Sequence, residues 1–109
     1  MQSEFVVVLV TVPSKDLGER IAKWLLEQGL IACANLIESV RSFYTWQGEI
    51  QIDKEVLMVL KTRADLFQDK LVPAIQTFHP YEVPEIIAVP IEMGAQNYLN
   101  WMEEVTSRQ

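Results

Sequence analysis

The sequence is short of the residues that most often build metal centres and active sites. It has one cysteine and one histidine, Cys33 and His79, in 109 residues. A single cysteine excludes an internal disulfide, and one chain alone cannot supply a metal site made wholly of His and Cys. Basic residues are also few. Nine Lys and Arg against 15 Asp and Glu give a net charge of −6, which argues against binding to nucleic acid.

The chain also lacks long apolar runs and low-complexity segments. The apolar run Phe5–Val10 follows Glu4 and no basic residue, unlike the charged start of a signal peptide. It is far shorter than the roughly 18 residues of a membrane span. Half of the residues are hydrophobic and 22% are charged, which excludes intrinsic disorder. We therefore expect a single domain over residues 1–109, in the cytoplasm and without a membrane partner.

The apolar residues that are present follow the spacing of strands in some segments and of helices in others. Gly29 is expected to end a first helix, Gln47-Gly48 to form a tight turn between two strands, and Pro73 to bend a second helix. The predicted strands cover residues 5–12, 31–44, 49–60 and 86–89, and the predicted helices cover 17–28, 67–78 and 98–105. The β-α-β-β-α-β order predicts an α+β fold, a ferredoxin-like sandwich with an added C-terminal helix.

The predicted sheet has more apolar surface than its helices can cover. Right-handed crossovers place both main helices on one face, yet three of the strands are apolar on both faces. A large uncovered apolar face is rare on soluble monomers. We therefore predict a homo-oligomer in which copies of the chain, aided by the C-terminal helix, cover the second face. The hairpin around Gln47-Gly48 is long enough to reach a neighbouring chain.

The segment from His79 to Ile86 concentrates polar and rigid residues between a helix and a strand. It contains an imidazole, a phenol, two carboxylates and two prolines, namely His79, Tyr81, Glu82, Glu85, Pro80 and Pro84. One interpretation is a stiff loop that binds a ligand or a metal ion, because prolines limit the entropy lost on ordering. The other is a braced turn in which His79 caps the last carbonyls of the preceding helix.

Four other residues allow both a structural and a functional interpretation. Cys33 lies among small apolar residues and is either an inert buried thiol or a soft ligand for copper or zinc. Tyr44 and Trp46 share one side of a strand and either support a subunit contact or form a pocket wall. Lys61 is either a cation at the rim of a cleft or an exposed strand end. The sequence contains no phosphate-binding glycine loop, Cys-x-x-Cys or His-x-x-x-His motif.

Five short motifs occur in these segments. They are Ala32-Cys33-Ala34-Asn35, Tyr44-x-Trp46-x-Gly48-Glu49-Ile50, Lys61-Thr62-Arg63, His79-Pro80-Tyr81-Glu82-Val83-Pro84-Glu85-Ile86 and Tyr98-Leu99-x-Trp101. In this order and spacing, the chain resembles the CutA family of divalent-cation tolerance proteins from about Phe5 to Trp101. The resemblance implies a ferredoxin-like trimer, similar to PII-type signalling proteins. It also implies a connection with copper and other divalent cations, and no established catalysed reaction.

The resemblance also bears on the metal ligands. Some relatives are described as binding copper through a first-strand cysteine and two adjacent histidines. The corresponding positions here hold Val10 and Phe78, and only His79 matches. This argues against a copper site of that composition. The candidate ligands for copper or another divalent cation are then His79, Cys33 and Glu82.

The leading hypothesis is a trimeric divalent-cation tolerance protein that binds metal and is not an enzyme. Besides the candidate ligands, its cleft between subunits would be lined by Tyr44, Trp46, Glu49, Lys61, Tyr81 and Glu85. One alternative is a PII-like sensor of a small molecule or anion, in which Lys61 supplies charge and the aromatic residues stack on the ligand. The other is a structural trimer that binds a protein partner and has no metal role.

Overall fold

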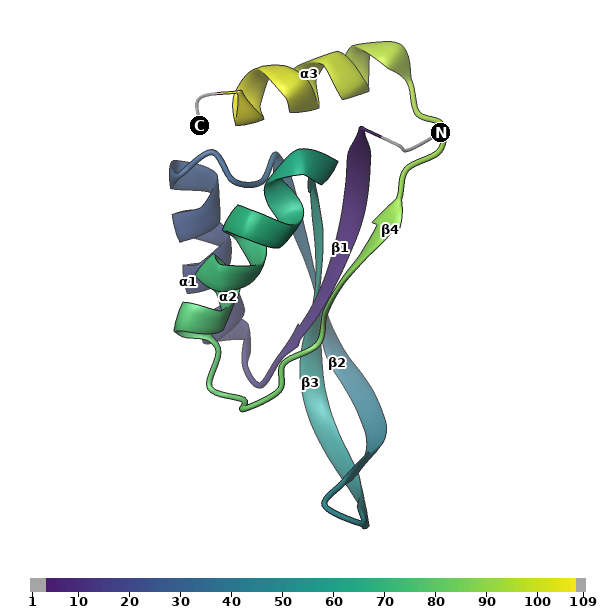
Figure 1. Ribbon diagram of the computed structural model, residues 1–109. Helices are drawn as coiled ribbons and strands as arrows, with labels where there is room; N and C mark the ends of the chain where they lie inside the picture. Colours follow the sequence, from purple (N-terminus) through teal and green to yellow (C-terminus); the bar gives the residue numbers. More distant parts are fainter. Residues whose placement is uncertain (1–3, 108–109) are drawn as a thin grey trace.

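The computed structural model describes residues 4–107, which contain the predicted order of elements (Figure 1). The strands are β1 (Phe5–Val12), β2 (Cys33–Trp46), β3 (Glu49–Arg63) and β4 (Ile86–Pro90), and the helices are α1 (Lys15–Glu27), α2 (Val72–Phe78) and α3 (Gln96–Thr106). The four strands form one antiparallel sheet in the order β2-β3-β1-β4. The predicted ferredoxin-like α+β fold is thereby confirmed.

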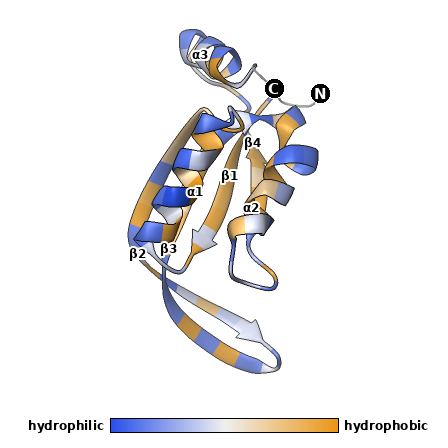
Figure 2. Ribbon diagram, turned by 90° about the vertical axis from the view of Figure 1, so that its left-hand side faces the viewer, coloured by the Kyte–Doolittle hydropathy of each residue, from blue (hydrophilic) through white to orange (hydrophobic). Residues whose placement is uncertain are grey.

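β1 lies inside the sheet and shows how the core is built. Its alternate valines from Val6 to Val12 are buried, whereas the residues between them point to the opposite face. Both α1 and α2 cover the same side of the sheet (Figure 2). The buried valines pack there with the apolar faces of the helices and of β3, including Ile21, Leu25, Ile75, Met58 and Leu60.

Helix α1 begins and ends at residues suited to these positions. The Ser14 side chain accepts a hydrogen bond from the Leu17 amide at 3.2 Å, which caps the first turn. At the other end Gly29 has a φ of 70°, which a residue without a Cβ adopts readily. The Leu30 amide then reaches back to the Leu25 carbonyl at 3.0 Å. The predicted stop at Gly29 is correct.

The second helical segment is less regular than predicted. A 3-10 turn (Ala64–Leu66) and a π-helical turn (Phe67–Leu71) precede α2, so the α-helix itself starts at Val72 rather than at residue 67. Pro73 lies in the first turn of α2, where its missing N–H costs little. It also has no amide to continue the α-helical hydrogen bonds of the preceding turn. The irregularity expected at Pro73 is therefore a change from a π-helical turn to an α-helix just before this residue.

The β2–β3 hairpin extends past the ends of β1 and β4 (Figure 1). Its turn residues Gln47 and Gly48 have φ values of 51° and 82°, which fits the twist of a two-residue hairpin turn. Hydrophobic and hydrophilic residues alternate along the extension (Figure 2). Each face of this two-stranded ribbon therefore has its own chemical character.

A bulge in β2 marks the point where the extension leaves the rest of the sheet. Ile37 pairs with Leu57, and Val40 pairs with Glu55, so β2 has one more residue than β3 in this interval. The added residue is accommodated by Ser39, whose φ is 63°. A bulge bends the strand pair and increases its twist. The hairpin extension can thus take its own direction relative to the four-stranded part.

The sheet face opposite α1 and α2, called the open face below, is apolar and largely uncovered. Ile37, Ile87 and Val89 on this face are 49%, 50% and 48% exposed. Leu9 and Val59 lie opposite each other at its centre. Helix α3 crosses one end of the sheet and leaves the rest free (Figure 1). Two helices therefore cover one face only, as expected, and the covering of the open face by other copies stays a prediction.

Candidate functional site

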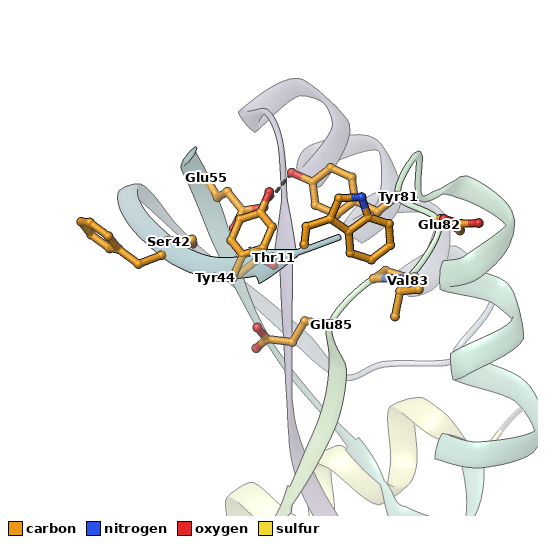
Figure 3. A pocket seen from close by; sticks show the side chains of 11 residues that line it. Thr11, Ser42, Tyr44, Glu55, Tyr81, Glu82, Val83 and Glu85 are labelled. Atoms are coloured by element: carbon orange, nitrogen blue, oxygen red, sulfur yellow. Dashed lines mark hydrogen bonds between the residues drawn. The ribbon is translucent and has the colours of Figure 1, made fainter. Parts of the chain in front are cut away.

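A cavity of about 630 Å³ lies between the base of the hairpin extension and the loop of residues 81–85 (Figure 3). Ser42, Tyr44 and Trp46 alternate along β2 and point to one side of the ribbon. The full lining consists of Thr11, Ser42, Phe43, Tyr44, Trp46, Glu55, Tyr81, Glu82, Val83, Pro84 and Glu85. Segments distant in sequence thus meet in one pocket.

Two tyrosine–carboxylate pairs organise this pocket. The Tyr81 hydroxyl donates to Glu55 Oε2 at 2.7 Å (Figure 3), and Glu55 is only 5% exposed. Burial, followed by this hydrogen bond, raises the pKa of Tyr81. The Tyr44 hydroxyl donates a short hydrogen bond to Asp53, and this bond is the main reason why the pKa of Tyr44 is raised. Both phenols are therefore held as neutral donors to carboxylates.

Raising the pH above about 10, the ordinary pKa of tyrosine, is expected to lower the free energy of unfolding. In the unfolded chain these phenols lose their protons near that pH. The raised pKa values keep them protonated in the folded protein, so alkaline pH favours the unfolded state. Tyr81→Phe should reduce this slope by up to about 1.4 kcal/mol per pH unit. Denaturant titrations between about pH 8 and pH 11 measure it, and an unchanged slope in the variant would contradict the prediction.

His79 connects the loop of residues 81–85 to β1 by hydrogen bonds. Its backbone is extended, as expected for a residue before Pro80. The ring is 7% exposed, and its Nε2–H donates to the Thr11 carbonyl at 2.7 Å. Nδ1 accepts a hydrogen bond from the Tyr81 amide at 3.2 Å, and the His79 and Tyr81 rings contact each other at a tilt of 54°, with centroids 4.6 Å apart. Both ring nitrogens are therefore used within the chain. His79 does cap α2, as one interpretation predicted, but through its backbone N–H, which donates to the Ile75 carbonyl at 2.9 Å, and not through its ring.

Cys33 and Lys61 lie at the other end of the open face, beside α3. They are paired across β2 and β3. The Lys61 Nζ lies 4.0 Å from the Cys33 Sγ and donates to the Asn35 side-chain oxygen at 2.7 Å. Tyr98 of α3 reaches the same group, since burial and then its interaction with Cys33 raise the pKa of Tyr98. Cys33, Lys61, Asn35 and Tyr98 therefore form a second polar cluster, which is separate from the pocket.

The structure divides the predicted site residues between these places. The predicted residues that line the pocket are Tyr44, Trp46, Tyr81, Glu82 and Glu85, whereas Glu49, Lys61, Cys33 and His79 do not. Lys61 lies six residues along β3 from Glu55, a pocket residue of the same strand, which is about 20 Å in an extended strand. The predicted cleft is therefore only partly assembled within one chain.

The predicted metal set is not assembled within one chain either. In the part of the chain that the structure describes, no three His, Cys, Asp or Glu side chains lie close enough to hold a metal ion. Cys33 lies at the opposite end of the open face from Glu82, and His79 has no free ring nitrogen. The set of His79, Cys33 and Glu82 therefore stays a prediction, and within one chain these three side chains do not come together.

Sequence reasoning missed several pocket residues, and Glu55 matters most among them. The others are Thr11, Ser42 and Phe43, whereas Val83 and Pro84 belong to the loop that one interpretation assigned to ligand binding. Counting residue pairs along the two strands back from the Gln47-Gly48 turn places Asp53 opposite Ser42. Tyr44 is two residues from Ser42 on the same side of β2, so this count predicts a carboxylate near Tyr44. The same count pairs Glu55 with Val40, on the side of the ribbon that carries Ser42 and Tyr44, because the bulge begins only beyond this pair. The signal for Glu55 was therefore present in the strand pattern.

The fold and the geometry of the hairpin define a class of protein. It is a ferredoxin-like α+β domain with a long β2–β3 hairpin, a C-terminal helix and one open sheet face. Residues 6–105 match the family described as CutA1 divalent ion tolerance protein, so the chain belongs to that family. The resemblance found in the five sequence motifs is thereby confirmed. None of the helices within residues 4–107 is long and apolar enough to cross a membrane.

Individual relatives agree with this assignment. The divalent-cation tolerance protein CutA of Thermus thermophilus is 46% identical over 100 residues, covering 92% of this chain and 96% of the relative. The crystal structure of CutA1 from Oryza sativa superposes with a TM-score of 0.92 at 39% identity, covering 99% and 98% of the two chains. The periplasmic divalent cation tolerance protein CutA from Archaeoglobus fulgidus gives 0.90 at 37%, covering 94% and 98%. The chain spans about half the length of the mouse and rice proteins it matches, 54% and 56%.

Proposed function

We propose that the chain acts in divalent-cation tolerance as a homotrimer and binds copper or another divalent cation at sites formed between subunits. The observation that carries the proposal is the family match over residues 6–105. The proposal assigns no catalysed reaction. It keeps the cytoplasm as the location, although the names of two relatives specify the chloroplast and the periplasm.

The open face supports the assembly. Its centre is built from Leu9 and Val59, and Ile87 at its edge is half exposed. Covering this face with other copies removes apolar area from water at about 25 cal/mol per Å². A continuous apolar face of this kind is typical of a contact between subunits rather than of free surface.

The proposed cation ligands are Cys33 and Glu82 from different subunits. A thiolate suits copper and zinc, and carboxylates can complete the coordination. Because these two side chains lie apart in one chain, a site that uses both needs at least two subunits. His79 is proposed to support the site indirectly, since it holds Tyr81 and thereby the loop that carries Glu82.

Calorimetric titration with Cu²⁺ and Zn²⁺ tests the proposal. Cys33→Ala and Glu82→Gln should each weaken cation binding by about tenfold or more. Lys61→Gln should strengthen it, because the ammonium 4.0 Å from the Cys33 Sγ repels a bound cation. Unchanged affinity in the first two variants would reject the ligands. A wild-type protein that binds neither ion would reject the cation role.

The alternative of an anion sensor stays a prediction, but the pocket within one chain does not favour it. It required Lys61 beside the aromatic residues, but Lys61 is not among the residues that line the pocket. The carboxylates of Glu55, Glu82 and Glu85 line it instead. Like charges would repel an anionic ligand there.

A further inference from the structure

The pocket at the base of the hairpin combines aromatic walls with acidic groups. The aromatic residues are Phe43, Tyr44, Trp46 and Tyr81, and the acidic ones are Glu55, Glu82 and Glu85. The lining contains no Lys, Arg or His. Carboxylates in a partly enclosed site, without a basic partner, create a negative potential that attracts cations.

Hydrogen bonding makes two of the aromatic walls richer in electrons. The hydroxyls of Tyr44 and Tyr81 each donate to a carboxylate, of Asp53 and Glu55 respectively. A phenol that donates to an anion gains electron density on its oxygen and ring, and the ring face is already the negative part of its quadrupole. Such faces attract cations. Since Glu55 is 5% exposed, its charge is also poorly screened by water.

The shape of the pocket favours a molecule over a bare ion. Its volume of about 630 Å³ lies within the usual range of small-molecule sites, roughly 300–1,000 Å³. Within residues 4–107 the carboxylates do not gather into a group of three metal ligands. Aromatic faces and Val83 offer nothing to a hydrated metal ion, but they fit the alkyl or aryl groups of an organic cation.

We propose that this pocket binds an organic cation, a quaternary or alkylated ammonium compound with an apolar substituent. The ammonium group lies against the faces of Tyr44 and Tyr81, near the carboxylates. The apolar part contacts Trp46 and Val83. Figure 3 shows Tyr44 and Glu85 reaching toward this space from different segments. This inference does not depend on the proposed divalent-cation role.

Calorimetric titration in EDTA tests the inference while keeping metal ions out. The probes are benzyltrimethylammonium, neutral benzyl alcohol and anionic benzoate, which share the phenyl group and differ in charge. We expect the ammonium compound to bind with a dissociation constant of about 1 mM or lower, at least tenfold tighter than the other two. Absence of saturable binding by about 10 mM, or equal binding of benzyl alcohol, would overturn the inference.

Two substitutions in the pocket separate its charge from its aromatic wall. Glu85→Gln keeps the shape and removes one charge, and it should weaken ammonium binding about threefold or more. Trp46→Leu keeps an apolar side chain and removes the ring, and it should weaken binding about fivefold or more. Glu27→Gln, at the end of α1, makes the same change in net charge outside the pocket. If Glu27→Gln weakened ammonium binding as much as Glu85→Gln, the net charge of the protein would explain the result. That outcome would contradict the inference.

Discussion

Val59→Asp is expected to separate the proposed homotrimer into single chains. Val59 lies at the centre of the open face, between Asn35 on β2 and Leu9 on β1. In a single chain this position is half-buried, so an aspartate there can keep contact with water. In the proposed trimer each aspartate would be buried against apolar surface, at a cost on the order of 3–5 kcal/mol that the ammonium of Lys61, bonded to Asn35, offsets only in part. Light scattering should then give the mass of one chain, 12.5 kDa.

A matched variant separates this effect from that of added charge. Gln76 is exposed on α2, on the far side of the sheet from the open face, so Gln76→Asp adds the same charge where no subunit contact is expected. This variant should keep the wild-type mass. Circular dichroism should show that both variants remain folded. A Val59→Asp protein that keeps the wild-type mass would mean that the open face is not the interface.

His79→Ala is expected to lower the free energy of unfolding by about 3 kcal/mol. The substitution removes the hydrogen bond to the Thr11 carbonyl and leaves the Tyr81 amide without its acceptor, each worth about 1 kcal/mol. It also removes the ring that contacts Tyr81 at a tilt, worth about another 1 kcal/mol. Denaturant titration measures the loss.

The exposed neighbour Gln76 again provides the comparison. Gln76→Ala, which removes an exposed helical side chain, should change the free energy of unfolding by less than about 0.5 kcal/mol. If His79→Ala were equally mild, His79 would not be the residue that fastens the loop to β1. If His79→Ala left stability intact but abolished cation binding, His79 would be a ligand after all.

The local features of the fold were predictable where one residue type decides the backbone. Gly29 and Gly48 have positive φ values that favour glycine, and the sequence placed a helix end and a turn there. The bulge at Ser39 was not predictable, because serine has no particular preference for a positive φ. Pro73 indicated an irregular helix. The type of irregularity depends on how the preceding turn packs, with Leu66 and Leu71 buried.

The site was only partly predictable because long-range pairing decides it. Alternation correctly places Tyr44 and Trp46 on one side of β2, and both line the pocket. His79, however, bonds to the carbonyl of Thr11, which lies 68 residues earlier in the chain. Lys61 lies six residues along β3 from Glu55 of the pocket. Neither relation appears in a local pattern, so the sequence grouped residues that the fold separates.

Comparing Zn²⁺ binding to the wild-type protein and to Val59→Asp shows whether the cation sites are formed between subunits. Zinc has no redox chemistry that would damage Cys33 during the titration. If the sites need more than one subunit, the wild-type protein binds Zn²⁺ and the folded single chains of Val59→Asp bind it at least about tenfold more weakly. Equal affinity in the two proteins would show that one chain suffices and would contradict a site shared between subunits.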